Sequence, residues 1–444
     1  MSSPISRLPP ELLLKTLRFV AHGTALVLYE APRTMTTPHA RQWSRLCLVS
    51  KTWFDLSEPE LYGKVPLWFK VGYFDPSVSP HEPGFEAAPL YQQLVTTPRL
   101  AALVRDLNLQ MAFLKTIEEQ GALGYLLSRI PNLVHLVLPI SGISSPILDG
   151  ILDDLARRTP PLRALGLSIV PDYSGAPYDA LARFGGLKKL RVSFFPGDHL
   201  FSSRFTRPTF QLTALRLDQS ISPSDFLALT FSSQSSLSSL CVALATSHPG
   251  YDLAGLLYLR SLTLSRRPTF EYTTWDSSKS GTDNPLQPFR ATLSSAFDLP
   301  NLITLELQTP LISDSGQDIV VDKDAELVSA ADLWTALPAS LLYLNLDLTA
   351  VFLTDVEFLL VWGKLRFLDL GVVVDSRTSR VVDAVEKEKL DGMADQNGRA
   401  IHWGRLEVAG YRRIEVELPT AGVQGNPAPV QRNGQSRRGR RPWR

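Results

Sequence analysis

Cysteine is almost absent from this 444-residue sequence, which contains only Cys47 and Cys241. Two cysteines cannot build a disulfide framework, and by themselves they cannot hold a structural zinc ion. Free cysteines are typical of reducing compartments, where disulfides do not persist. The sequence therefore predicts a protein of the cytoplasm, the nucleus or both.

An excess of charge of either sign is missing as well. The chain has 45 lysine and arginine residues against 44 aspartate and glutamate residues, which gives a formal net charge of +1. This balance gives no reason to expect binding to nucleic acid or to a membrane surface. The apolar stretch 12–28 is interrupted by Lys15, Arg18 and His22. We therefore expect neither a signal peptide nor a membrane span.

The sequence motifs of common enzyme active sites are also missing. There is no P-loop, no G-x-S-x-G, no H-E-x-x-H and no pair of C-x-x-C sequences. The seven histidines are scattered, and no two of them have a spacing typical of metal ligands. We therefore expect no catalysis, no metal and no other cofactor, and we turn to binding functions.

Two apolar helices are predicted near the N-terminus. The first covers Leu8–Val20, where Pro9 and Pro10 suit the first turn because the first amides of a helix have no internal partner. The second covers Ala40–Leu56, and Pro59 is expected to end it. Two short helices cannot bury their apolar faces alone. Their periodicity by itself predicts a helical cap on the next domain.

Three motifs in order give residues 5–65 a more specific meaning. They are Leu-Pro-x-Glu-Leu-Leu, Leu-Val-Ser-Lys-x-Trp and Pro-x-Leu-Tyr, and in this order they resemble the F-box, in a form similar to fungal F-box-like proteins. The resemblance implies that residues 1–66 form a helical module that binds the Skp-type adaptor of a cullin-based (SCF) ubiquitin ligase. The segment 21–40 between the two helices is longer than is usual in this family. The adaptor-binding residues implied by the resemblance are Leu8, Pro9, Glu11, Leu12, Leu13, Leu17, Leu48, Val49, Trp53, Leu61 and Tyr62.

After a linker expected at 67–98, the pattern Leu-x-x-Leu-x-Leu recurs along the chain. Most of the spacings between copies are typical of leucine-rich repeats, in which a short strand turns alternate leucines inward and a returning segment covers them. The alternative is a leucine-rich α/β domain with chance matches. The middle residues of the eleven copies are Leu107, Leu136, Leu165, Leu190, Leu215, Leu240, Leu262, Leu305, Leu344, Leu368 and Leu406.

These observations predict an α/β fold, with the N-terminal helical F-box followed by a leucine-rich-repeat solenoid over residues 99–410. The solenoid is expected to be irregular, because the asparagine or cysteine that usually follows the strand is missing. Helical patterns fall between the strands at 145–160, 178–186, 222–231 and 355–365.

Three long gaps between copies predict insertions. Residues 266–297 are polar and predict an exposed loop, residues 313–337 begin acidic and end as a helix, and residues 371–400 include a charged helix. The extension 411–444 ends in a tail that should be disordered. Its arginines fit a nuclear-import or nucleic-acid patch, although we favour a plain solvated tail. They are Arg437, Arg438, Arg440 and Arg441.

The residues that flank the strand leucines should line the concave face of the solenoid, because side chains alternate along a strand. Basic residues gather toward one end of this face, and acidic and aromatic residues gather toward the other. A protein target with separated acidic and basic-plus-apolar segments fits this polarity. The alternative is that these are ordinary solvated charges. The predicted target-binding residues are Lys189, Arg191, Arg216, Glu306, Tyr343, Asp347, Phe367 and Asp369.

The function implied is that of a substrate-recognition subunit of a cullin-type ubiquitin ligase. Such a subunit would bind the Skp-type adaptor through the F-box and an unknown protein target through the repeats, with the cullin scaffold as a further partner. It would act by raising the effective concentration of the target rather than by bond chemistry. The alternative is a non-catalytic repeat scaffold that binds partners without directing ubiquitination.

Overall fold

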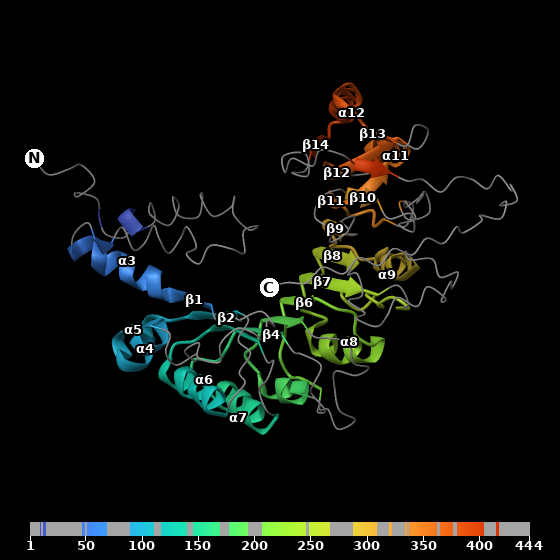
Figure 1. Cartoon of the computed structure of the whole chain (residues 1–444). Coiled ribbons are helices and arrows are strands. Elements are labelled where there is room, and N and C mark those ends of the chain that lie inside the picture. Colours follow the sequence, from blue (N-terminus) through green and yellow to red (C-terminus); the bar gives the residue numbers. More distant parts are fainter. Residues whose placement is uncertain are drawn as a thin grey trace, which may run out of the picture.

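The computed structural model describes most of the repeat region and short pieces of the N-terminal region (Figure 1). The described residues are 9, 12–14, 47–48, 51–68, 89–110, 117–139, 145–168, 177–193, 207–245, 248–266, 287–308, 319–321, 334, 337–361, 365–375, 380–403 and 414–416.

One curved sheet of 13 strands runs through these residues (Figure 1). Its strands lie in sequence order up to β12, β14 also pairs with β12, and all of the pairs are parallel except β12 with β13. A parallel pair needs a crossover connection, so each repeat is one strand and one returning segment. The strands are β1 Lys64–Trp68, β2 Asp106–Gln110, β3 His135–Pro139, β4 Ala164–Ser168, β5 Lys189–Ser193, β6 Ala214–Leu217, β7 Ser239–Leu244, β8 Ser261–Arg266, β9 Thr304–Gln308, β11 Tyr343–Phe352, β12 Phe367–Asp375, β13 Arg380–Val381 and β14 Ala400–Trp403.

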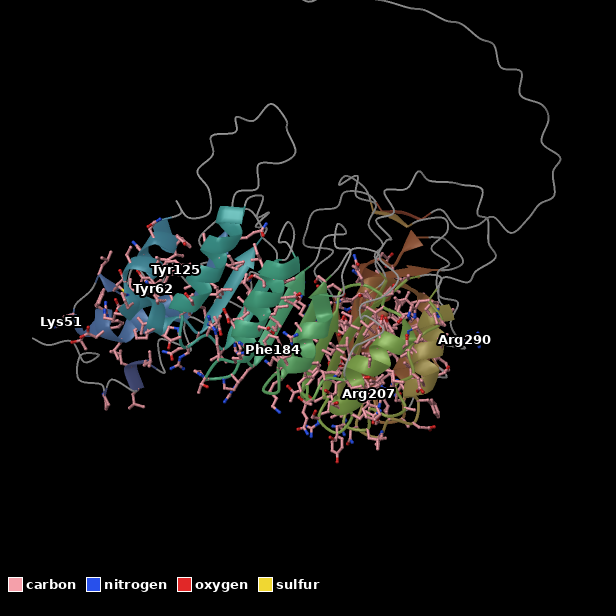
Figure 2. All side chains as sticks on the ribbon, turned by 90° about the horizontal axis from the view of Figure 1, so that it is seen from below. Lys51, Tyr62, Tyr125, Phe184, Arg207 and Arg290 are labelled. Atoms are coloured by element: carbon pink, nitrogen blue, oxygen red, sulfur yellow. The ribbon has the colours of Figure 1, made fainter. Side chains whose placement is uncertain are left out.

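The returning helices lie on the convex side of this sheet (Figure 1). Figure 2 looks at that side and follows the array from Tyr125 in α6 past Phe184 to Arg290 in α9. The helices are α3 Lys51–Gly63, α4 Pro89–Thr96, α5 Pro98–Leu103, α6 Ile117–Arg129, α7 Ser145–Ala156, η3 Pro177–Arg183, α8 Pro223–Thr230, η4 Phe231–Ser233, α9 Gln287–Ala296, α11 Leu353–Val361 and α12 Ala384–Gln396, of which η3 and η4 are 3₁₀ helices.

The middle leucines of the repeats form one continuous ladder in the core. Leu107 pairs with Leu136, and the register continues through every later repeat to Leu368. The leucines of this ladder are at most 2% exposed. The inward phase predicted from the motif is confirmed, and the chain forms an α/β solenoid of leucine-rich repeats.

The four helices predicted between strands are confirmed in position by α7, η3, α8 and α11. The N-cap of α8 shows why this helix begins where it does. The Oγ of Ser222 accepts a hydrogen bond from the amide of Asp225 at 3.1 Å, and Pro223 occupies the first helical turn, where its missing amide costs nothing.

Polar side chains just before the first leucine of several repeats tie one repeat to the previous one. Asn132 donates to the carbonyl of Ala102 at 2.7 Å, and Asn301 donates to that of Leu257 at 2.8 Å. Ser236 and Ser340 donate in the same way to carbonyls of the preceding repeat. These contacts satisfy backbone carbonyls in the turns. They take the place of the asparagine that usually follows the strand in leucine-rich repeats and is missing here.

The C-terminal end of the sheet differs from the sequence prediction. The last strand was predicted at 403–408 around Leu406, but β14 ends at Trp403, and residues 404–413 lie outside the described residues. Ile401 pairs with Leu368 and so takes the inward place that was assigned to Leu406. Consequently 371–400 is not an insertion: it holds the end of β12, β13 and the returning helix α12 of this last repeat.

The other two predicted insertions contain ordered structure. The end of 266–297 is helix α9, whose Phe289, Leu293 and Ala296 are buried in the core. The prediction of an exposed loop is therefore wrong there, since these apolar residues sit at helical spacing. Within 313–337, β10 (Ile319–Val321) pairs in parallel with β15 (Ile414–Val416) of the predicted extension, and Trp334 is buried.

The N-terminal boundary also differs from the prediction. Helix α3 begins at Lys51 and continues past Pro59 to Gly63, although Pro59 was expected to end it. An internal proline costs a helix about 3 kcal/mol. Glu58, the residue before Pro59, is buried and paired with Arg99, and this tertiary contact stabilises the helix at the proline. β1 then joins the sheet at Lys64, and α4 lies within the predicted linker 67–98, so the repeat sheet starts well before residue 99.

Candidate protein-interaction surface

Two rows of side chains cross the concave face of the sheet, one on each side of the buried leucine ladder. The register of the strand pairs places corresponding residues next to each other in each row. In the central repeats the first row is Lys189, Ala214, Ser239, Ser261, Thr304, Tyr343 and Phe367, and the second is Arg191, Arg216, Cys241, Thr263, Glu306, Asn345 and Asp369.

Two arginines on neighbouring strands share one buried carboxylate. The Nε of Arg191 lies 2.7 Å from Oδ2 of Asp218, and the Nε of Arg216 lies 2.6 Å from Oδ1. The hydroxyl of Ser193 donates to the same carboxylate. Burial alone raises the pKa of Asp218, but the hydrogen bonds from Arg216 and Ser193 and the charges of both arginines outweigh it, so that this pKa lies below its ordinary value.

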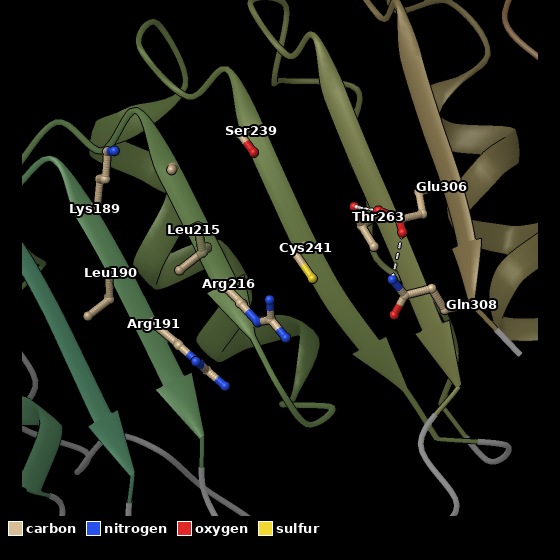
Figure 3. A pocket seen from close by; sticks show the side chains of 11 residues that line it. Lys189, Leu190, Arg191, Leu215, Arg216, Ser239, Cys241, Thr263, Glu306 and Gln308 are labelled. Carbon is tan, nitrogen blue, oxygen red and sulfur yellow. Dashed lines mark hydrogen bonds between the residues drawn. The ribbon is translucent and has the colours of Figure 1, made fainter. Parts of the chain in front are cut away.

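A shallow hollow of about 360 Å³ lies beside this arginine pair (Figure 3). It forms because the row between Lys189 and Thr304 carries only small side chains, from Ala214 to Ser261. Cys241 faces the hollow, and burial raises the pKa of its thiol. A thiol of raised pKa is a poor nucleophile at neutral pH.

Glu306 lies at the opposite side of the hollow. Its Oε2 accepts from the hydroxyl of Thr263 at 3.0 Å, and its Oε1 accepts from the amide of Gln308 at 2.7 Å (Figure 3). Asn345 on β11 points at Oε1 from 3.5 Å. The carboxylate is therefore held in place by neutral donors, which orient it without cancelling its charge.

Aromatic and acidic residues follow on the next two strands. The hydroxyl of Tyr343 donates to the carboxylate of Asp369, and Nδ1 of His402 lies 3.8 Å from Oδ1 of the same residue. Phe367, beside Tyr343 in the first row, is 52% exposed. A large exposed ring beside fixed polar groups is typical of residues that anchor protein interfaces.

The structure places the predicted target-binding residues on this face as strand alternation required, apart from Asp347, which lies in β11 and whose side chain is not described. It also corrects the predicted basic patch, because the charge of Arg191 and Arg216 is partly balanced by Asp218. Asp218 was not among the predicted target-binding residues. Asp218 follows β6 directly and stands two residues after Arg216, and this position is the signal in the sequence that could have indicated their pairing.

The predicted adaptor-binding residues are only partly described. Pro9 begins a helical turn, since its carbonyl accepts from the amides of Leu12 and Leu13 at 3.0 Å each. Leu12 is 49% exposed and Leu48 is 86% exposed, whereas Leu13 is buried. Trp53, Leu61 and Tyr62 are half-buried on α3. The predicted residues Leu8, Glu11, Leu17 and Val49 lie outside the described residues.

Searches for other kinds of site give negative results within the described part of the chain. No group of three or more histidine, cysteine, aspartate or glutamate side chains there could hold a metal ion. Among the described helices, none is both long enough and apolar enough to cross a membrane. Both cysteines are free.

Comparisons with known proteins add little to this description. No family model matches the chain, and no curated protein matches it. Among solved structures, the chain is similar to an internalin (inlF) from Listeria monocytogenes, with 14% sequence identity and a TM-score of 0.31. That similarity covers 90% of this chain and 97% of the internalin chain.

Proposed function

We propose that the concave face of this solenoid binds a protein target. The supporting observation is that the two rows carry fixed charges, the half-buried ring of Tyr343 and the exposed ring of Phe367, while the leucines between them supply the core. Nothing about core packing requires these surface groups. Interfaces are enriched in arginine and aromatic residues, which are the residues that project here.

We further propose that residues 5–65 bind a Skp-type adaptor and make the chain a substrate receptor of a cullin-type ubiquitin ligase in the cytoplasm or nucleus. The three ordered F-box-like motifs support this proposal. Leu12 and Leu48, two of the residues that the resemblance assigns to adaptor binding, are exposed. In this role the chain has no catalytic group of its own, and it brings a target close to an enzyme bound elsewhere.

The second candidate is a repeat scaffold that binds partners without directing ubiquitination. The solenoid and its concave rows fit this candidate equally well. What distinguishes the two is the partner bound by the N-terminal residues.

Purification of the tagged full chain from cells, followed by mass spectrometry, separates the two candidates. The ligase proposal predicts that the adaptor and the cullin are recovered together. Recovery of the adaptor without a cullin would favour the scaffold. Recovery of neither would overturn the proposed adaptor site. The concave face is tested separately, by Tyr343→Ala with Phe367→Ala, which should reduce capture of the target and leave capture of the adaptor intact.

A further inference from the structure

The arginine pair on β5 and β6 presents unused donors to a partner. Asp218 engages the Nε of both Arg191 and Arg216, whose side chains are still 51% and 54% exposed. In the part of the chain that the structure describes, the terminal nitrogens of these two guanidinium groups have no hydrogen-bond partner. Lys189 adds a third cation on the same face, so three cations stand against one carboxylate. This arrangement accepts an oxyanion, and the shared carboxylate fixes both arginines before binding.

The arginine pair forms one charged pole of the concave face, and Glu306 forms the opposite pole, three strands away from Arg216 in the same row. The register runs from Arg216 through Cys241 and Thr263 to Glu306. Neighbouring strands are about 4.8 Å apart, so the backbones of the strands that carry Arg216 and Glu306 are separated by roughly 14 Å across the sheet. Glu306 has only neutral hydrogen-bond donors among the described residues. A carboxylate has lone pairs for more donors than these, so it can accept a basic side chain as well.

The surface between the two poles carries small, uncharged side chains. Ser239, Cys241 and Thr263 line the hollow there, and none of them is charged (Figure 3). A partner that spans the poles therefore meets space for a side chain at the middle of its path. An uncharged residue suits this position, because a charge placed there would lose water without gaining an opposite charge.

The distance between the poles converts into a spacing in the partner. An extended chain advances about 3.4 Å per residue, so roughly 14 Å corresponds to four residues. Residues four apart in an extended chain face the same side, and so does the residue midway between them. A helical partner advances about 1.5 Å per residue and would need its two charges some nine residues apart.

We propose that the concave face binds an extended segment of the target in which an acidic residue and a basic residue stand four positions apart, with an uncharged residue midway between them. The acidic residue binds Arg191 and Arg216, the basic residue binds Glu306, and the middle residue enters the hollow. Either chain direction satisfies this spacing. The inference rests on the proposed function, since it names the chemistry of the target segment at the same surface.

The test is a selection of displayed random twelve-residue peptides on the purified full chain, followed by affinity measurements. Enriched peptides should carry aspartate or glutamate four positions from lysine or arginine. Their affinity should fall by roughly twofold to fivefold for Arg191→Ala with Arg216→Ala, and also for Glu306→Gln. Arg157→Ala, which removes an exposed arginine from the helical side, is the matched control and should leave affinity unchanged.

A second readout locates the bound peptide. In the Cys47→Ser variant, Cys241 is the only cysteine of the sequence, and it lies in the hollow. A bound peptide should slow alkylation of Cys241 by iodoacetamide. Peptides that slow alkylation but have another charge spacing overturn this inference and leave the proposed binding face standing. Peptides that neither slow alkylation nor respond to the arginine variant contradict both. A selection on the natural chain that enriches no peptide relative to a parallel selection on the arginine variant also contradicts the inference.

Discussion

Arg99 donates from both terminal nitrogens to the two carboxylate oxygens of Glu58, at 2.5 and 2.6 Å. The Glu58 side chain is only 7% exposed, while Arg99 is 65% exposed. Glu58 lies on α3 and Arg99 lies on α5, the helix that precedes β2. This two-pronged contact joins the N-terminal helix to the first repeat, so α3 and the sheet should behave as one body.

Removing Arg99 should loosen this junction. Arg99→Ala leaves the carboxylate of Glu58 buried without its cation, which is an unfavourable state. We expect faster hydrogen exchange of the α3 amides and little change in the central strands. The double variant Arg99→Ala with Glu58→Gln should recover part of the protection, because no buried charge is then left unpaired. Unchanged exchange of α3 in the single variant would contradict the proposed junction.

The leucine ladder makes a strong prediction about stability. Leu215 is 1% exposed, so Leu215→Ala should lower the free energy of unfolding by about 2–5 kcal/mol through lost burial and a cavity. Lys189→Ala, on the concave side of the next strand, is the control and should cost far less. Arg216→Ala is a poorer control, because it also disturbs Asp218. Urea unfolding of the two variants measures the difference, and equal losses would show that the inward phase is wrong.

His248 should make stability fall in mild acid. It is 9% exposed, its Nε2 lies 2.8 Å from the carbonyl oxygen of Ile221, and its Nδ1 accepts from the amide of Gly250 at 3.0 Å. Burial lowers the pKa of His248 in the folded state, so below about pH 6.5 the unfolded chain binds a proton that the folded chain does not. The free energy of unfolding should therefore fall between pH 7.5 and 5.5, by at most about 1.4 kcal/mol per pH unit from this residue.

Urea unfolding at both pH values checks this prediction. His248→Gln should flatten the pH dependence of the free energy of unfolding relative to that of the natural sequence. An unaltered slope in His248→Gln would show that the buried imidazole is not the source.

Asp218 should contribute to stability over a different pH range. Its pKa in the folded state lies below the ordinary value, so its contribution is complete above about pH 4 and is lost as the pH falls through the folded pKa. Asp218→Asn should be less stable at pH 6 and should lose less on acidification to pH 3. Asp395→Asn, an exposed position on α12, serves as the control. If the free energy of unfolding of both variants falls with pH in parallel with that of the natural chain, Asp218 is not stabilised by the two arginines.

Local patterns predicted the repeating part of the fold well. Alternation of leucines within one strand predicted the inward phase, and the helical patterns between strands predicted the positions of α7, η3, α8 and α11. Features set by distant contacts were missed. Helix α3 continues through Pro59 beside Glu58, which pairs with Arg99 of a later helix, and β14 pairs with β12 through Ile401 and Leu368. No local motif marks either contact.

The same division applies to the candidate site. Strand alternation placed Lys189, Arg191 and Glu306 on one face without any knowledge of tertiary contacts. The role of Asp218 could not be derived in this way, because it follows the end of β6 and only the bend of the chain there brings it back between two arginines. The carboxylate then changes a simple basic patch into a fixed pair of donors.

We propose that the chain joins a Skp-type adaptor at its N-terminal end to a target at its concave face. The most direct test is quantitative recovery of adaptor and cullin with the tagged full chain and with Leu12→Ala plus Leu48→Ala, two partly exposed positions. Leu227→Ala on α8, at 53% exposure, is the matched control. The account predicts that the double variant loses adaptor and cullin together, while the control retains both and all three proteins stay folded. Equal recovery from the double variant, or no recovery with the natural sequence, would contradict it.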